Sequence, residues 1–513
     1  MSGARASTRR TPPAGPRPCQ TWRLWCAVLV FVGLLPAVSA GGAEPEVQPI
    51  RAFCIDFNWG PGGPNGFAPP GLWADASPEE HVAWYGGLGA NVIQTFAVSC
   101  NGYAWYKGGV VPEQPGLRHD FLTEVVRLGH ERGMKVMGYF CVGANTLWAN
   151  EHPDLSYGAP SAPHIPFTAE YLDYLCASIT DGLQLTGMDG FMIDWVWNAS
   201  GKWLDCEKGM YEELMDEPFP GPGGVDDGKL LEFSRRAVDR CWGRIREAAK
   251  GANPDCVIWL SCNNVTNPSV VDSRMFREVD WLMNEATDPA ALRGVERMKG
   301  EQTRLVQCVV GWGDSHDARA IVSGADAGGM GIYGFSAPRA TSLPLPIAEY
   351  RNRPIIGFQG NDRNIAVLAR YYRGELIDVT APQGPGGEIV LAPESANARG
   401  TSPFLTEGQI GNWANPSDCV TWLVNVEKPG TFEVEMEYAC APGCGGSTLD
   451  VVVGKESLRL VSEETGGWRD YRQTRLGRVR VAEAGQCCVT VRPCTETPWK
   501  AVSLKGLTFR PVP

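Results

Sequence analysis

The sequence predicts a (β/α)8 TIM barrel followed by an antiparallel β-sandwich, and three observations indicate this fold class. From Arg51 to about Gly374, short β-branched or aromatic runs alternate with amphipathic helical stretches, as in repeated βα units around a parallel sheet. A Pro/Gly-rich segment, TAPQGPGGE, follows at 380–388. Beyond it, apolar and polar residues alternate with a period of two, which is typical of strands with one face in water.

The first forty residues have the pattern of an export signal. They contain five Arg and no acidic residue, followed by an apolar run that closes on Val38-Ser39-Ala40. The run is short for a membrane span and Pro36 interrupts it. We therefore expect cleavage near Gly41, no membrane association afterwards, and a secreted or periplasmic protein.

The expected domains are a signal peptide at 1–40, a barrel at 41–380, a linker at 381–388 and a sandwich at 389–513. Eight units over the barrel region match the size of a TIM barrel with long loops. The eight candidate strands are Arg51–Trp59, Asn91–Val98, Lys135–Gly143, Gly190–Trp197, Cys256–Asn264, Val279–Ala286, Thr303–Trp312 and Gly329–Ala337.

Cysteine is distributed unevenly along the chain. The cysteines in apolar barrel strands are interpreted as small buried hydrophobes; they are Cys54, Cys141, Cys256 and Cys308. Six more fall in the last hundred residues, and that density in an exported chain predicts disulfides of undetermined connectivity. These six are Cys419, Cys440, Cys444, Cys487, Cys488 and Cys494.

Charge and composition restrict the partners. The formal net charge is −12, and loss of the five leader arginines brings it to about −17, which disfavours nucleic acid and anionic membranes. No zinc-ligand spacing occurs, so we expect no metal and no cofactor. The chain contains 18 Trp and 14 Tyr, whose flat rings stack on sugars. An oligosaccharide or polysaccharide substrate fits these features.

The most informative segment is TGMDGFMIDWVW at 186–197. Its apolar run places Asp194 at the end of the fourth candidate strand, on the face where TIM barrels carry their active sites. Burial of a carboxylate there costs free energy, so its presence indicates a functional role. The alternative is an Asp that caps the next helix or pairs with an Arg.

Three blocks of the barrel resemble the α-L-fucosidase family of glycoside hydrolases, family 29. They are YGGLGANVIQTFAVSCNGYAWY, LRHDFLTEVVRLGHERGMKVMGYF and GMDGFMIDWVW. The tail is similar to the β-sandwich that often follows that barrel, through IGNW, DCVTWLVNVEKPGTFEVEMEYAC and GGWRDY. The resemblance implies a retaining glycoside hydrolase with Asp194 as the nucleophile, and a carbohydrate-binding sandwich.

A retaining mechanism needs a second carboxyl group roughly 5–5.5 Å from the nucleophile as acid and base. Glu285, at the end of the sixth candidate strand, is the best choice because strand ends converge on the barrel mouth. A helix N-terminal acid ahead of Pro289 is its structural alternative. Asp314 and Asp288 are the reserve candidates.

The sequence departs from the family pattern after the second strand. Fucosidases of this family usually have a His-His-Asp-Gly-Phe run there, in which the paired His contact the fucose hydroxyls. This chain has Ser99-Cys100-Asn101-Gly102-Tyr103, a hydroxyl and a thiol in place of two imidazoles. Because a site discriminates steeply through such hydrogen bonds, the departure does not support fucose as the sugar, and the sequence leaves the sugar unidentified.

Further substrate-binding residues are expected near the same strand ends. They are Asp56, Trp59, Asn101, Trp105, Tyr139, Asn145, Trp197 and Asp314. Two other interpretations remain open. A barrel without a second carboxyl group facing Asp194 would be a carbohydrate-binding protein without catalysis. An inverting enzyme would hold its carboxyl pair roughly 6.5–9.5 Å apart to admit water.

Overall fold

The computed structural model describes residues 48–60, 66–158, 162–262, 265–286, 289–311, 318–336, 362–375, 377–399, 404–406, 408–411, 413, 415–494 and 496–512. The predicted signal peptide lies outside these ranges. No helix within them is both long and apolar enough to cross a membrane.

The predicted barrel is confirmed. Eight parallel strands pair in chain order and close through β1 and β8, with Ala52 opposite Tyr333. Each lies within the run predicted for it: β1 Arg51–Ile55, β2 Val92–Gln94, β3 Lys135–Cys141, β4 Gly190–Asp194, β5 Val257–Cys262, β6 Trp281–Asn284, β7 Arg304–Val310 and β8 Gly331–Ser336.

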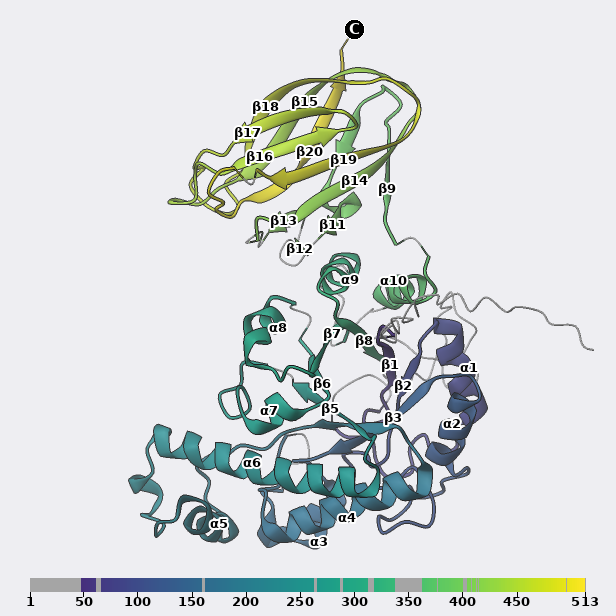
Figure 1. The fold of residues 1–513 in the computed structure, drawn as a ribbon, viewed down its shortest axis with the longest axis vertical. Coiled ribbons are helices and arrows are strands. Elements are labelled where there is room, and N and C mark those ends of the chain that lie inside the picture. The colour runs from purple at the N-terminus through teal and green to yellow at the C-terminus, as the bar shows by residue number, and fades with distance from the viewer. Residues whose placement is uncertain are drawn as a thin grey trace, which may run out of the picture. The chain divides into compact units, whose positions relative to one another are not determined.

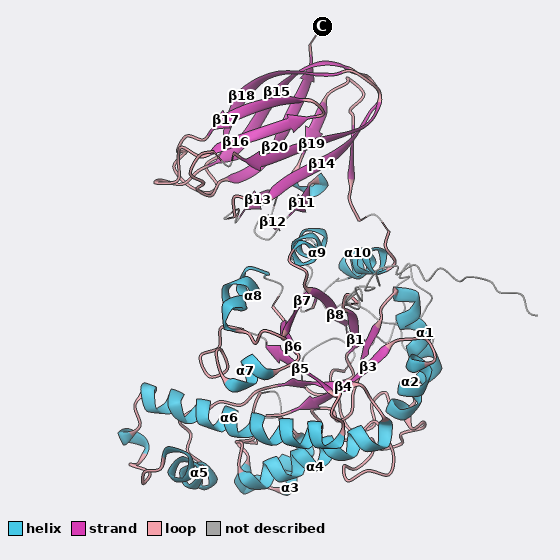
Figure 2. Ribbon diagram, in the orientation of Figure 1, coloured by secondary structure: helices cyan, strands magenta, loops and turns pink. Residues whose placement is uncertain are grey.

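Helices lie outside the ring of barrel strands (Figures 1 and 2). They are α1 Pro78–Leu88, α2 Phe121–His130, α3 Thr146–Glu151, α4 Ala169–Thr186, α5 Asp205–Met215, α6 Asp227–Ala252, α7 Arg274–Glu278, α8 Pro289–Val295, α9 Ala318–Ala327 and α10 Asp362–Tyr372. Helix α4 shows how the chain enters β4. The Thr168 side chain accepts a hydrogen bond from Tyr171 N–H at its start, and Gly187, with φ of 69°, ends it. The chain then turns directly into the strand that carries Asp194.

The tail forms two sheets around its own apolar core, as predicted. One sheet has the order β12-β13-β20-β15-β18 with β10 on β20, and the other β11-β14-β19-β16-β17 with β9 on β14. The strands are β9 Thr380–Pro382, β10 Ile389–Leu391, β11 Asn397–Arg399, β12 Phe404–Thr406, β13 Gln409–Gly411, β14 Cys419–Val426, β15 Gly430–Ala439, β16 Thr448–Val453, β17 Glu456–Val461, β18 Arg472–Val481, β19 Gly485–Pro493 and β20 Ser503–Pro511.

The pattern of alternating residues in the tail is also confirmed. In β15 the apolar side chains point into the core; these are Phe432, Val434, Met436 and Tyr438. Strand β9, at 380–382, spans the expected boundary between barrel and linker, and it pairs in parallel with β14. The sheet therefore begins at Thr380, within the Pro/Gly-rich segment.

Candidate active site

Three carboxyl groups follow the C-terminal ends of barrel strands. Asp194 is the last residue of β4, Asp56 comes directly after β1, and Glu285 comes directly after β6. In TIM-barrel enzymes this end of the strands carries the active site. The described residues thus place the two predicted catalytic carboxyls and one predicted binding carboxyl at the same end of the barrel.

Neutral donors hold Asp194. The Tyr139 hydroxyl donates to Oδ2 at 2.8 Å, and the Trp195 backbone N–H donates to Oδ1 at 2.8 Å. Burial raises the pKa of Asp194 to about 6, against the lowering effect of these two hydrogen bonds. The group is therefore ionised at neutral pH while it remains desolvated, which suits a nucleophile.

Asp56 is a second partly buried carboxyl group at the mouth. Its Oδ1 accepts from Asn58 N–H at 2.9 Å, and its Oδ2 accepts from Trp59 Nε1 at 3.0 Å. Burial and, to a smaller extent, the charge of Asp194 raise the pKa of Asp56 to about 7. Near neutral pH this group therefore exists in both protonation states.

Glu285 faces the interior of the barrel. Its N–H donates to the Cys262 carbonyl at 2.8 Å, and its Oε2 accepts from the Ser261 hydroxyl at 3.3 Å. Burial raises the pKa of Tyr139 and of Tyr333, and the charge of Glu285 raises both further. Because Asp194 and Asp56 also act on Tyr139, this phenol lies within electrostatic reach of all three carboxyl groups.

An aromatic wall stands beside Asp194. The ring centroid of Trp195 lies 6.4 Å from that of Trp59 and 5.2 Å from that of Phe67. Trp195 has a φ of 58°, which is uncommon for a bulky residue. Such backbone conformations occur most often at functional sites. The carbonyl of Trp195 also passes so close to Gly143 that a Cβ there would lie 2.2 Å from it. The backbone thus turns sharply directly after the candidate nucleophile.

Two predicted binding residues lie in the core instead of at the mouth. Trp197 is 0% exposed and packs against Phe167 and Phe233. Trp105 is 1% exposed and stacks on Phe57 with ring centroids 4.7 Å apart. Neither has surface available for a sugar. Trp195, unlike Trp197, is partly exposed, and its positive φ interrupts the extended backbone directly after Asp194.

Two Asn side chains that were predicted to bind substrate form hydrogen bonds within the loops instead. Asn101 accepts from Gln114 Nε2 at 3.0 Å and donates to the Ala68 carbonyl at 3.2 Å. Asn145 caps α3 by accepting from Trp148 N–H at 2.8 Å. Both side chains fix loops around the mouth, which is the ordinary role of Asn outside regular structure.

Other predicted residues have different outcomes. Asp314 and Asp288 lie outside the described residues. Trp59 and Tyr139 do lie at the mouth, in contact with Asp56 and Asp194 respectively. Within the described ranges, no group of three or more His, Cys, Asp or Glu residues is arranged to hold a metal ion.

The cysteine predictions require correction. Cys100 and Cys141 form a disulfide, so Cys100 presents no thiol to a substrate and Cys141 is not an isolated buried hydrophobe. Five of the six tail cysteines for which disulfides were predicted are free: Cys440, Cys444, Cys487, Cys488 and Cys494. Strand register explains part of this outcome, because Cys487 and Cys488 lie opposite Val424 and Leu423. Cys54, Cys256 and Cys308 are buried thiols as predicted.

Comparison with known proteins supports a glycoside hydrolase. The family model described as "Hypothetical glycosyl hydrolase 6" matches residues 77–195. The matched segment runs from just before α1 to the residue after β4, and so includes Tyr139 and Asp194. No curated protein matches the chain.

Solved structures with a similar fold have low sequence identity. α-L-Fucosidase isoenzyme 2 from Paenibacillus thiaminolyticus is 16% identical with a TM-score of 0.48, over 64% of this chain and 49% of that one. An α-L-fucosidase from Vibrio sp. strain EJY3 is 11% identical with a TM-score of 0.35, over 85% and 87%. The C-terminal CBM6 of LamC, a laminarinase from Zobellia galactanivorans, is 17% identical with a TM-score of 0.20, over 24% and 98%. The chain thus spans about half the length of the first of these proteins, and at these scores none of them defines an activity.

Proposed function

We propose that this protein is an exported, retaining glycoside hydrolase with Asp194 as its nucleophile. The observation that carries the proposal is Asp194 itself: a desolvated carboxyl group at the end of β4, oriented by a phenol and a backbone amide. The match to a glycosyl hydrolase family model over residues 77–195 supports the same class. The N-terminal export pattern supports a secreted or periplasmic location.

In the proposed reaction, the ionised Asp194 attacks the anomeric carbon while a second carboxyl group protonates the leaving oxygen. That group then deprotonates the water that hydrolyses the glycosyl-enzyme. Glu285 is the proposed acid and base, since it faces the barrel interior from β6. Asp56 shares the mouth and is proposed to contact a sugar hydroxyl.

Phe67 and Trp195, which are partly exposed, are the proposed stacking surface for the sugar, and Trp59, which is buried, packs against both. The substrate is proposed to be an oligosaccharide or polysaccharide other than a fucoside. The position after β2 that would contact fucose in the resembling family holds a disulfide sulfur instead of an imidazole. The sandwich is proposed to bind carbohydrate.

The test is a screen of aryl glycosides and natural oligosaccharides with wild type beside Asp194→Asn. Turnover in wild type should fall at least about a thousandfold in the variant, with little change in melting temperature, because the carboxylate acts on the transition state. If Asp194→Asn kept activity within about tenfold, which is only about 1.4 kcal/mol, Asp194 would not be the nucleophile. Sugar binding without any turnover in wild type would instead identify a carbohydrate-binding protein.

A further inference from the structure

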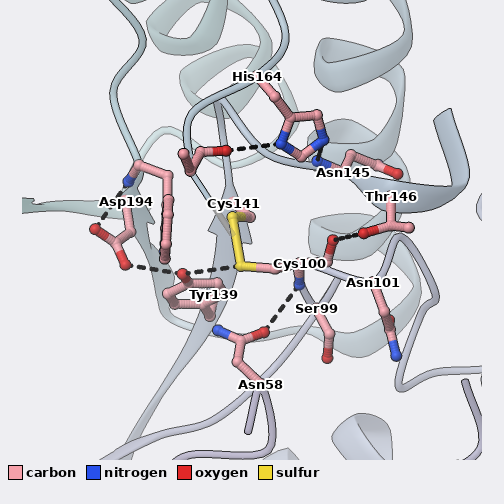
Figure 3. The surroundings of a disulfide bond; sticks show 12 residues. Asn58, Ser99, Cys100, Asn101, Tyr139, Cys141, Asn145, Thr146, His164 and Asp194 are labelled. Carbon is pink, nitrogen blue, oxygen red and sulfur yellow. Dashed lines mark hydrogen bonds between the residues drawn. A yellow bond between two sulfur atoms is a disulfide. The ribbon is translucent and has the colours of Figure 1, made fainter. Parts of the chain in front are cut away.

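The Cys100–Cys141 disulfide joins two segments next to the candidate nucleophile (Figure 3). Cys141 is the last residue of β3 and lies opposite Asp194 in the register of β3 and β4. The next residue, Val142, donates its N–H to the Asp194 carbonyl at 2.9 Å. One half of the disulfide is therefore fixed to the strand end that presents the candidate nucleophile.

The other half of the disulfide connects the loops after β1, β2 and β3. Cys100 donates its N–H to Asn58 Oδ1 at 2.9 Å, and Asn58 in turn donates its N–H to Asp56. The Cys100 carbonyl accepts from Thr146 N–H at 3.0 Å. A displacement of Cys100 would therefore be transmitted to the loop that holds Asp56.

The Cys100 sulfur also touches the residue that orients Asp194. It lies 3.6 Å from the Tyr139 hydroxyl, which Figure 3 shows between the disulfide and the Asp194 carboxylate. A disulfide sulfur has no proton to donate and is a weak acceptor. The single proton of Tyr139 is thus left for Asp194 Oδ2, at 2.8 Å.

We propose that the Cys100–Cys141 disulfide is a positioning cross-link of the candidate active site, which holds the Tyr139 hydroxyl on Asp194 and the Asp56 loop beside it. The inference rests on the proposed function and deepens it. Cys100 is 0% exposed and Cys141 is 5% exposed, so reductants have little access in the folded protein. Substitution is therefore a better probe than reduction.

The cross-link predicts a measurable titration change. The groups that face Asp194 are Asp56 after β1, Tyr139 on β3 and Cys262 on β5, while Glu285 after β6 acts on Tyr139 and Cys262. The Tyr139 hydrogen bond lowers the pKa of Asp194. If the cross-link is lost and this bond loosens, the pKa of Asp194 should rise.

The experiment compares full-length wild type, Cys100→Ala/Cys141→Ala and a control, Cys176→Ala/Cys241→Ala. The control also removes two cysteines, but these are free thiols on α4 and α6. A peptide map of unreduced wild type should contain the Cys100–Cys141 link. The pKa of Asp194 is followed by carboxyl ¹³C NMR, with Asp194→Asn to assign its signal.

The cross-link variant should raise the pKa of Asp194, and the acidic limb of kcat on an activated aryl glycoside, by about one pH unit. The cross-link variant should also lower kcat about tenfold, with a smaller change in KM. The control variant should leave the pKa of Asp194, kcat and KM unchanged. If the alanine pair does not fold, Cys100→Ser/Cys141→Ser is measured in the same way. Absence of the linked peptide, or an unchanged pKa of Asp194 in the folded variant, would overturn the inference. A raised pKa in a protein whose wild type turns over no glycoside would reject the proposed function and leave the cross-link standing.

Discussion

The barrel mouth and the β-sandwich place their acidic residues in opposite environments. At the mouth, Asp56 and Asp194 are desolvated and held by neutral donors, and their pKa values rise to about 7 and about 6. In β15 of the sandwich, the acidic residues lie on the outer face beside cations: Glu437 pairs with Lys505 at 2.9 Å and Glu435 with Arg510 at 3.3 Å. Acidic side chains are therefore desolvated in one domain and paired with cations on an outer face in the other.

Disulfide pairing does not follow the density of cysteine along the chain. Five of the six sandwich cysteines are free, whereas two cysteines at the mouth that are 41 residues apart form a disulfide. Pairing requires Cα atoms at a suitable separation, and at the mouth this separation is 5.4 Å. The comparison shows that local density in the sequence does not determine disulfide pairing.

Among the acidic residues of the two domains, we expect the largest loss of turnover on substitution of Glu285. Glu285→Ala should reduce turnover of natural glycosides about 10²- to 10⁴-fold, because an alkyl or sugar leaving group needs a proton in the transition state. Nitrophenyl glycosides should lose far less. Added azide should restore turnover on them and yield a glycosyl azide of inverted configuration.

The matched comparison is Asp56→Ala under the same conditions. If Asp56→Ala shows the leaving-group dependence and the azide rescue while Glu285→Ala loses both substrate types equally, the acid and base role moves to Asp56. Rates on paired aryl and natural substrates, and identification of the azide product, decide between these outcomes.

The next effect concerns stability against pH. In the folded protein the pKa of Asp56, about 7, exceeds the ordinary value of 3.8 for an aspartic acid in water. Between these values the folded state binds more protons than the unfolded state, so the free energy of unfolding falls as pH rises. The ionisation of Asp56 should therefore lower the free energy of unfolding by about 3–4 kcal/mol between pH 4 and pH 8.

Urea unfolding of wild type and Asp56→Asn at pH 4, 6 and 8 measures this contribution. The variant should show a smaller decrease across the range, whatever its absolute stability. Parallel decreases in the two proteins would mean that Asp56 titrates normally and that burial at the mouth does not desolvate it.

The smallest effect is expected in the sandwich. Glu437→Gln should change the free energy of unfolding by less than about 1 kcal/mol at any pH from 5 to 8, because its partner Lys505 is exposed and such pairs contribute little. Turnover should not change. A loss of several kcal/mol would show that the outer face of β15 is not a solvated surface.

The barrel and sandwich could be predicted from periodicity because burial of one strand face follows directly from alternating residues. Asp194 could be found because an acid at the end of an apolar strand is unusual. The left-handed backbone at Trp195 and the disulfide could not be predicted, since they depend on the local turn after β4 and on contacts between distant loops. Trp105 and Asn145 were predicted to contact a ligand, whereas the structure places Trp105 in the core and Asn145 at the start of α3, because side-chain type alone does not separate packing or helix capping from binding.

Trapping of the glycosyl-enzyme decides whether Asp194 is a glycosidic nucleophile. A panel of activated 2-deoxy-2-fluoro glycosides is incubated with wild type and with Asp194→Asn, and the peptides are analysed by mass spectrometry. A sugar adduct on Asp194 in wild type, absent from Asp194→Asn, is the expected result. An adduct on Asp56 or Glu285, or turnover of the natural glycoside with inversion, would show that Asp194 is not the nucleophile of a retaining enzyme.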